Sequence, residues 1–205
     1  MQKLFSMDGK LIYILNKIAD MIILNLLWIL CCLPIVTIGA STTALQYVVL
    51  KMVRNEESYV VQSFFRAFKE NLRQSTIVWM ILMLLGMVLY LDFYYAMHTN
   101  SVFAKATIFM VSGIAFLILF MANYVFPVMS FFENTTKKVI KNSFLMAIAH
   151  LPYTVLIMLI NLIPFFLLFA GDFFVGMFLD LIIAVSFTAW VNAHLFRKLF
   201  DRYIG

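Results

Sequence analysis

Near its start the sequence reads Leu33-Pro34-Ile35-Val36-Thr37-Ile38-Gly39-Ala40-Ser41-Thr42-Thr43-Ala44-Leu45, and this stretch interrupts a long apolar region. Residues 21–50 are too many for one ordinary membrane span, which needs about 20 residues. Pro34 lacks a backbone N–H and disfavours helix at Leu33, and Gly39 lowers helix propensity further. We therefore predict a helical hairpin over residues 19–53 with a tight turn at Pro34–Gly39. One long kinked helix is the alternative, and the second helix is short enough to be either re-entrant or fully spanning.

The composition is that of an integral membrane protein. Of the 205 residues, 64% are hydrophobic and 12% are charged, and the mean hydropathy is +0.99. A soluble domain could not cover so much apolar surface. The apolar runs are continuous rather than alternating in segments of about ten residues, which favours helices over a barrel. We predict an all-α, polytopic helical membrane protein that forms one domain over residues 1–205, with the lipid bilayer as its surroundings.

Hydropathy and turn residues divide the chain into about six membrane helices. Before the hairpin, residues 1–18 read as an amphipathic lead that lies along the membrane surface. A short surface helix over residues 137–150 precedes the fifth span, and Gly171–Asp172 turns the chain before the sixth. The remaining predicted segments are an amphipathic cytoplasmic helix at 63–74 and membrane spans at 75–97, 106–128, 151–170 and 173–196.

The positive charges indicate the topology. Fourteen of the fifteen Lys and Arg residues lie in four segments, which are the lead, residues 51–73, residues 137–141 and the C-terminal tail. Only Lys105 lies elsewhere. Cytoplasmic loops carry an excess of Lys and Arg, so we expect these four segments and both termini in the cytoplasm of a multi-pass protein of the bacterial plasma membrane. The excess charge reflects topology and not nucleic-acid binding.

The segment 63–74 has two faces. Phe64, Phe65 and Phe68 fall on one arc at helical spacing, and Arg66, Lys69 and Arg73 fall on the neighbouring arc. Rings among the acyl chains and cations at the phosphates are typical of an interfacial helix. The same pattern also suits docking of a partner helix, so both interpretations stay open.

Motifs for catalysis are missing from the sequence. It has no glycine-rich phosphate loop, no paired His/Glu metal motif and no serine nucleophile elbow. The two cysteines, Cys31 and Cys32, are adjacent and point to different helix faces, so they suit packing and not a metal site. We expect no enzyme activity, no metal and no cofactor.

Polar residues inside apolar segments are the remaining candidates for function. The candidate binding pathway comprises Thr37, Ser41, Thr42, Thr43, Gln46 and Asp180. Small hydroxyl residues also permit close helix packing, and Asp180 could instead be solvated at the outer interface, or share an outward-facing cavity with Asp92 and Asp172. Four asparagines sit in or near different spans and suit interhelical hydrogen bonds: Asn25, Asn123, Asn161 and Asn192.

Several motifs resemble the YesL family of bacterial integral membrane proteins, a family of unknown function. They are Asn25-Leu26-Leu27-Trp28, Leu33 to Ala40, Phe64-Phe65-Arg66-Ala67-Phe68-Lys69, Phe126-Pro127 and His150-Leu151-Pro152. The resemblance implies that the protein is encoded beside carbohydrate uptake transporters of the ATP-binding-cassette type, two-component sensors and polysaccharide-degrading enzymes. It brings no established site residues.

Two functional hypotheses follow. The first is a non-enzymatic accessory protein that works with a carbohydrate transporter or its sensor through the basic cytoplasmic helices. The second is a small transporter or substrate-binding membrane subunit, with its pathway near Thr37–Gln46 and Asp180. Either could act as a homo-oligomer.

Overall fold

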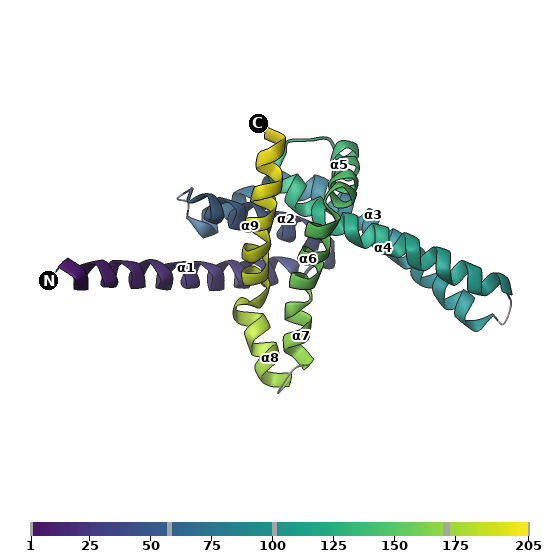
Figure 1. Cartoon of the computed structure of the whole chain (residues 1–205), viewed down its shortest axis with the longest axis horizontal. Helices are drawn as coiled ribbons and strands as arrows, with labels where there is room; N and C mark the ends of the chain where they lie inside the picture. The colour runs from purple at the N-terminus through teal and green to yellow at the C-terminus, as the bar shows by residue number, and fades with distance from the viewer. Residues whose placement is uncertain (1, 57–58, 100–101, 170–172, 205) are drawn as a thin grey trace.

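The computed structural model describes residues 2–56, 59–99, 102–169 and 173–204, and these are helical apart from short connections (Figure 1). Its described part contains six helical segments that are long and apolar enough to cross a membrane. The predicted all-α, polytopic fold is confirmed. The six segments are Leu11–Cys32, Ile35–Arg54, Val60–His98, Phe103–Phe131, Leu151–Phe169 and Phe173–Tyr203.

Helix α1 (Gln2–Cys32) joins the predicted lead and the first span into one element. No proline interrupts residues 2–32, so the helix has no reason to end at residue 18. Leu11, Ile14 and Leu15 are each more than half exposed along the part that projects alone to the left in Figure 1. The expected surface-lying lead, separate from the span, is therefore replaced by a continuous helix.

The break after α1 is the predicted tight turn. Helix α1 ends at Cys32, a single turn η1 (Ile35–Thr37) follows, and helix α2 (Ile38–Arg54) begins at once. The Thr37 hydroxyl donates to the carbonyls of Cys31 and Pro34 at 2.7 and 2.8 Å. It thereby satisfies the Cys31 carbonyl, one of those that the end of α1 leaves without intrahelical partners.

Gly39 lies inside α2 and not in the turn. A Cβ atom there would lie 2.6 Å from the Ser75 carbonyl oxygen and 2.7 Å from the Trp79 Cβ. The missing side chain therefore lets helix α3 (Val60–His98) cross α2 at close range. Thr43 and Ser75 share a hydrogen bond of 2.9 Å at the same crossing. Small residues at a crossing are the usual means by which membrane helices approach closely.

Helix α2 is the centre of the molecule. Ten of its 17 residues are buried, and it packs against α1, α3, α4 and α9. Half of its most apolar window is buried, whereas the other five candidate spans are buried by 28% or less. A helix with such a high share of buried residues faces protein on most sides, so the bundle is built around a short early segment.

Helices α3 and α4 (Val102–Phe131) form a long antiparallel hairpin that extends to the right of the body in Figure 1. Helix α3 has 39 residues. With a rise of about 1.5 Å per residue it spans about 58 Å, nearly twice the apolar thickness of a bilayer. The predicted cytoplasmic helix 63–74 and the predicted span 75–97 are therefore parts of one helix, and no proline or glycine lies at their junction.

The next segment is divided by two prolines. Helix α5 (Thr136–Ala149) ends before Pro152, and α6 (Leu151–Asn161) begins with this proline in its first turn, where a missing N–H is tolerated. Pro164 interrupts the helix again, so α7 (Ile163–Phe169) is separate. The surface helix expected at 137–150 and the following span agree with α5 and with α6–α7.

The last span contains a widened turn. Helix α8 (Phe173–Leu179) passes through the π-helical turn η2 (Asp180–Ala184) into α9 (Val185–Ile204). The loop between α7 and α8 lies outside the described residues, and so do the predicted turn at Gly171–Asp172 and any role of Asp172.

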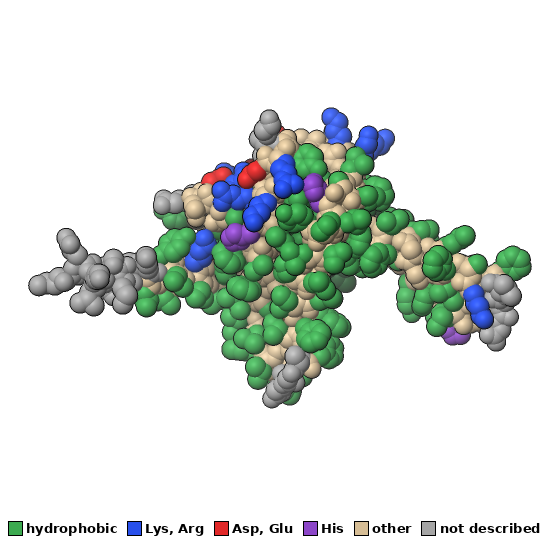
Figure 2. Space-filling model, in the orientation of Figure 1, with side chains coloured by type: hydrophobic (Ala, Val, Ile, Leu, Met, Phe, Trp, Pro, Cys, Tyr) green, Lys and Arg blue, Asp and Glu red, His purple; other side chains and the backbone are tan. Residues whose placement is uncertain are grey.

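Three of the four basic segments meet at one end of the molecule. Arg54 forms an ion pair of 2.9 Å with Asp201, and Arg197 donates to the Val53 carbonyl at 2.9 Å. Lys17 reaches the Met52 carbonyl at 3.3 Å. Figure 2 shows Lys and Arg side chains over the upper part of the body. The surface of α7 and α8, which point downward, and most of the α3–α4 hairpin, which extends to the right, are hydrophobic. This grouping agrees with the prediction that these segments lie on the same side of the membrane.

Candidate functional site

A ladder of three asparagines links three helices and runs from the buried Asn192 through the exposed Asn161 to the half-buried Asn123. The Asn192 amide of α9 donates to the Asn161 carbonyl oxygen of α6 at 2.7 Å. Asn161 donates in turn to Asn123 of α4 at 2.6 Å, and Asn123 donates to the Leu119 carbonyl at 2.7 Å. All three bonds run in the same direction, so each polarises the next. The predicted interhelical role of these asparagines is confirmed.

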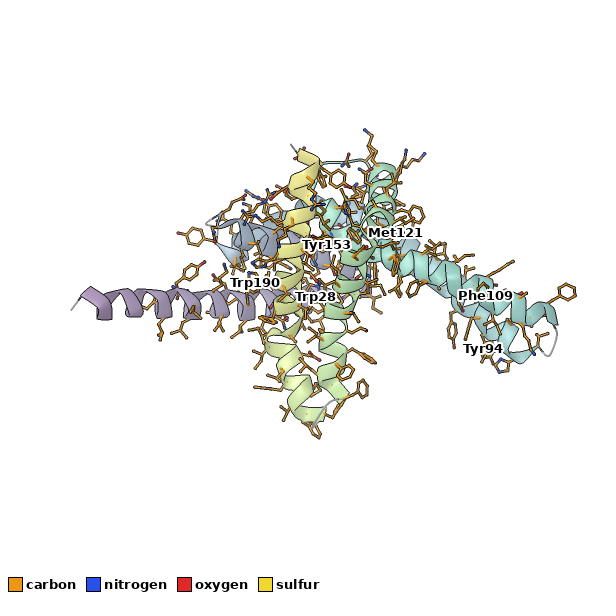
Figure 3. The ribbon with its side chains drawn as sticks, in the orientation of Figure 1. Trp28, Tyr94, Phe109, Met121, Tyr153 and Trp190 are labelled. Carbon is orange, nitrogen blue, oxygen red and sulfur yellow. The ribbon has the colours of Figure 1, made fainter. Side chains whose placement is uncertain are left out.

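A cavity of about 170 Å³ lies beside this ladder, where five of the helices converge. Trp28 of α1 forms part of its wall and lies in the middle of the bundle in Figure 3. Its indole N–H donates to the Thr42 hydroxyl at 3.3 Å. The remaining lining residues are Leu45, Gln46, Ala122, Asn123, Phe126, Pro127, Asn161, Val185, Thr188 and Ala189.

Gln46, in the cavity wall, has a side-chain acceptor that makes no hydrogen bond to the described residues. Its Oε1 atom is buried and accepts no hydrogen bond from the described residues. The Asn192 Oδ1 at the start of the ladder is also buried without a partner there. A buried acceptor without a donor costs about 1–3 kcal/mol, so each of these atoms is unusual in a folded protein.

Asn25 holds the π-helical turn. Its amide nitrogen donates to the carbonyls of Asp180 and Leu181, both at 2.9 Å. Its oxygen accepts from the backbone N–H of Ser186 at 2.9 Å. A π-helical turn leaves backbone groups without their usual partners, and this one side chain satisfies three of them. Asn25 is therefore a structural clamp between α1 and the last span.

A second hollow lies at the end of the molecule where the cations gather. This groove of about 1140 Å³ is bounded by α3 on one side and by residues 129–136 on the other. Gln74 donates to the Asn134 carbonyl at 2.8 Å and ties the two sides together. The lining is mixed, because Ile77, Phe131 and Phe132 stand beside Arg66, Glu70 and Arg73.

The cations around this groove differ in their partners. Arg66 donates to the Tyr47 hydroxyl at 2.6 Å and lies 4.0 Å from Glu70. The ion pairs found in the described part of the chain are Arg54–Asp201, Arg66–Glu70 and Arg197–Asp201. There, Arg73 lines the groove without an acidic partner, and Glu133 lines it as well. Four exposed lysines on α3 and α5 also have no acidic partner there: Lys69, Lys137, Lys138 and Lys141.

The six residues predicted to form a binding pathway do not line one cavity. Thr37 caps α1, and Ser41 and Thr43 are fully buried in contacts between helices. Thr42 and Gln46 line the cavity of about 170 Å³. Asp180 is not among its lining residues, although its Oδ1 is buried without a partner among the described residues.

In the predicted interfacial helix 63–74, the burial of the aromatic residues differs from what the sequence pattern predicts. Phe64 is completely buried in the protein core and stacks on the half-buried Phe68, with ring centroids 6.2 Å apart. The Phe64 ring cannot enter the acyl chains, because other helices of the protein cover it. Phe65 is 40% exposed, and Arg66, Lys69 and Arg73 are exposed as expected.

Sequence reasoning misses two cavity residues. Trp28 stands out in the sequence only as part of a motif, and Thr188 carries no signal beyond being a hydroxyl residue in an apolar helix. Both line the cavity from helices at opposite ends of the chain. Periodicity alone cannot place residues so distant in the sequence on the same wall.

Among the described residues, no group of three or more His, Cys, Asp or Glu side chains is placed to hold a metal ion. The described histidines lie in different parts of the chain: at the end of α3, between α5 and α6, and in α9. His98 bonds the Tyr94 carbonyl, His150 bonds the Tyr203 hydroxyl, and His194 bonds the Trp190 carbonyl. Each of these rings has a local structural partner.

Comparison with known proteins gives two similarities. Residues 21–93 match a family model described as "Protein of unknown function, DUF624". The chain is also 28% identical over 148 residues to "Uncharacterized protein YteU" of Bacillus subtilis (strain 168), a match that covers 70% of this chain and 66% of that protein, just under two thirds of its length. No solved structure matches. The family match covers the last part of α1, the break, α2 and most of α3.

Proposed function

We propose that this protein is a non-enzymatic accessory membrane protein, which docks an acidic amphipathic helix of a partner in the groove between α3 and residues 129–136. The observation that carries the proposal is an open, mixed polar and apolar groove of about 1140 Å³ flanked by cations without acidic partners among the described residues. A helix with an apolar face and acidic flanks matches both features. Complementary charge at the rim would steer and orient such a partner.

The groove would face the cytoplasm of a bacterial plasma membrane, together with both termini. The support is the charge count, because the groove is lined by residues of the basic segment 51–73 and ends where α5, with its three lysines, begins. Most of the exposed apolar surface lies along the other parts of the helices, where it would contact lipid.

The narrower resemblance to the YesL family suggests which partner to examine first. It points to a carbohydrate transporter of the ATP-binding-cassette type or to its two-component sensor. A second copy of this chain is the competing occupant of the groove.

Site-specific photo-crosslinking tests this docking. A photoreactive amino acid at Asn71, which lines the groove, is compared with one at Tyr203, which is 51% exposed on α9. We expect Asn71 to crosslink in the native membrane to an acidic cytoplasmic segment of a transporter or sensor subunit, and Tyr203 not to do so.

Charge reversal supplies the control. The double variant Lys69→Glu and Arg73→Glu should remove the crosslink without loss of membrane insertion. Lys198→Glu and Arg202→Glu change the charge equally on α9 and should leave it intact. Crosslinks to lipid alone, to a second copy of the chain, or of equal yield in both double variants would contradict the proposal.

The alternative, a small transporter, has less support. Its expected pathway residues are dispersed, and only Thr42 and Gln46 share a cavity. Solute uptake into proteoliposomes that is saturable and is lost in Asp180→Asn would favour this alternative over the accessory role.

A further inference from the structure

The cavity beside the asparagine ladder adjoins two interruptions of membrane helices. Asn161 lines it from the last residue of α6, just before the break that Pro164 imposes. Val185 lines it from the first residue after the π-helical turn. Interrupted helices near the middle of the membrane are a common setting for solute sites in membrane proteins.

The lining selects against charged ligands. None of the twelve residues that line the cavity is Lys, Arg, Asp, Glu or His. Five carry neutral polar groups, and the others are apolar or aromatic. An ion inside the bundle would lack a counterion and lose its hydration, so the chemistry favours a neutral ligand.

The polar groups favour a ligand with hydroxyls. Gln46 Oε1 needs a donor. The hydroxyls of Thr42 and Thr188 already donate to the carbonyls of Ile38 and Val185 at 2.8 and 2.9 Å, so toward a ligand they act as acceptors. A ligand hydroxyl can donate to such acceptors, and the ring of Phe126 and the side chains of Leu45 and Val185 suit a C–H surface. The cavity volume is about 170 Å³. Since a water molecule takes up about 30 Å³ in the liquid, this is the space of roughly five or six waters.

We propose that this cavity binds one small neutral polyol of about the size of glycerol or erythritol, and that the Gln46 side chain turns its buried Oε1 toward the ligand to accept a hydrogen bond from a ligand hydroxyl. The proposal goes beyond docking at the groove, which lies elsewhere on the molecule and does not depend on it. Asp180 takes no part in this site.

The test is a fluorescence titration of the full chain in lipid nanodiscs with glycerol and with erythritol. Trp28 is the tryptophan in the cavity wall, so its emission reports occupancy, and Trp28→Phe removes the reporter. Sucrose, which is too large for the cavity, controls for the effect of solute on the solvent. We expect a saturable change with glycerol or erythritol that sucrose does not cause and that Trp28→Phe lacks.

Two variants probe the polar walls. Gln46→Met removes the unpartnered acceptor and should weaken polyol binding by about 2- to 10-fold, the range expected for one net hydrogen bond. Its matched control, Gln62→Met on the exposed first turn of α3, should bind as the wild type does. Thr188→Val keeps the shape of the cavity wall on α9 and should also weaken binding. This second variant still tests the proposal if Gln46→Met does not fold.

Three results would overturn the proposal. They are a change that does not saturate with either polyol, a response to sucrose equal to that with glycerol, and wild-type affinity in both Gln46→Met and Thr188→Val.

Discussion

Gly39 provides the sharpest test of how the bundle is built. The replacement Gly39→Ala adds one methyl group at the crossing of α2 and α3. That methyl would lie 2.6 Å from the Ser75 carbonyl oxygen and 2.7 Å from the Trp79 Cβ. Both atoms are held close to the backbone of α3, so the helix itself must move.

The size of the effect follows from these contacts. Overpacking of a close contact costs about 1–3 kcal/mol. If α3 moves away, the bond of 2.9 Å from the Trp79 indole N–H to the Ile35 carbonyl is weakened as well. The loss of this bond adds about 0.5–1.5 kcal/mol. Against this, the change from Gly to Ala favours helix by up to about 1 kcal/mol.

Gly86→Ala is the matched control, because it makes the same change in α3 with nothing within 4 Å of the added atom. The gain in helix propensity is common to both variants and cancels in their difference. We therefore expect Gly39→Ala to be less stable than Gly86→Ala by about 2–4 kcal/mol.

Reversible unfolding in mixed micelles, followed by circular dichroism, measures this difference. Free energies of unfolding for the two variants that agree within about 0.5 kcal/mol would refute the close crossing of α2 and α3.

Three further predictions concern other contacts. Asn25→Leu removes three hydrogen bonds to the π-helical turn, whereas Asn71→Leu removes an amide that bonds only its own helix. In the same assay the first should lower the free energy of unfolding by about 2 kcal/mol and the second by less than about 1 kcal/mol. Asn55 has a φ of 56° at the end of α2. Asn55→Val should therefore destabilise by about 1–2 kcal/mol and Asn55→Gly should not, and equal stabilities would argue against this left-handed cap. Arg54 and Asp201 form a partly exposed ion pair. A double-mutant cycle should give a coupling of at most about 1 kcal/mol that disappears in about 1 M salt, and coupling that persists there would show a stronger, buried contact.

The membrane class and the position of the break could be predicted because both depend on local composition. Pro34 disfavours a continuous helix through its own position in the chain, although Pro127 is accommodated inside α4. Continuous apolar runs of this length indicate membrane spans. The same local reasoning misjudges Gly39, which looks like part of the turn. Its role depends on Ser75 and Trp79, which are neighbours in space but distant in the sequence.

The amphipathic segment shows a second limit. The arc of Phe64, Phe65 and Phe68 correctly indicates one apolar face, but periodicity does not say whether protein or lipid covers that face. Because α2 lies at the centre of the bundle, protein and not lipid covers Phe64, which is completely buried.

The asparagines show what sequence reasoning can and cannot do with buried polar groups. Their placement in apolar helices predicts hydrogen bonds between helices, since unpaired amides in hydrocarbon are unfavourable. It could not predict that Asn123, Asn161 and Asn192 form one ladder while Asn25 clamps a π-helical turn. It also could not separate Gln46, which faces the cavity, from Thr43, which faces α3.

The proposed docking of a cytoplasmic partner requires the basic groove to face the cytoplasm. To test this, Cys31 and Cys32 are replaced by Ala, and single cysteines are introduced at Lys69, Lys138 and Thr99 for labelling with a reagent that does not cross membranes. We predict that Thr99→Cys is labelled in intact cells, and that Lys69→Cys and Lys138→Cys are labelled only after the membrane is opened. Labelling of Lys69→Cys or Lys138→Cys in intact cells would contradict the six-span topology and the docking of a cytoplasmic partner in the groove.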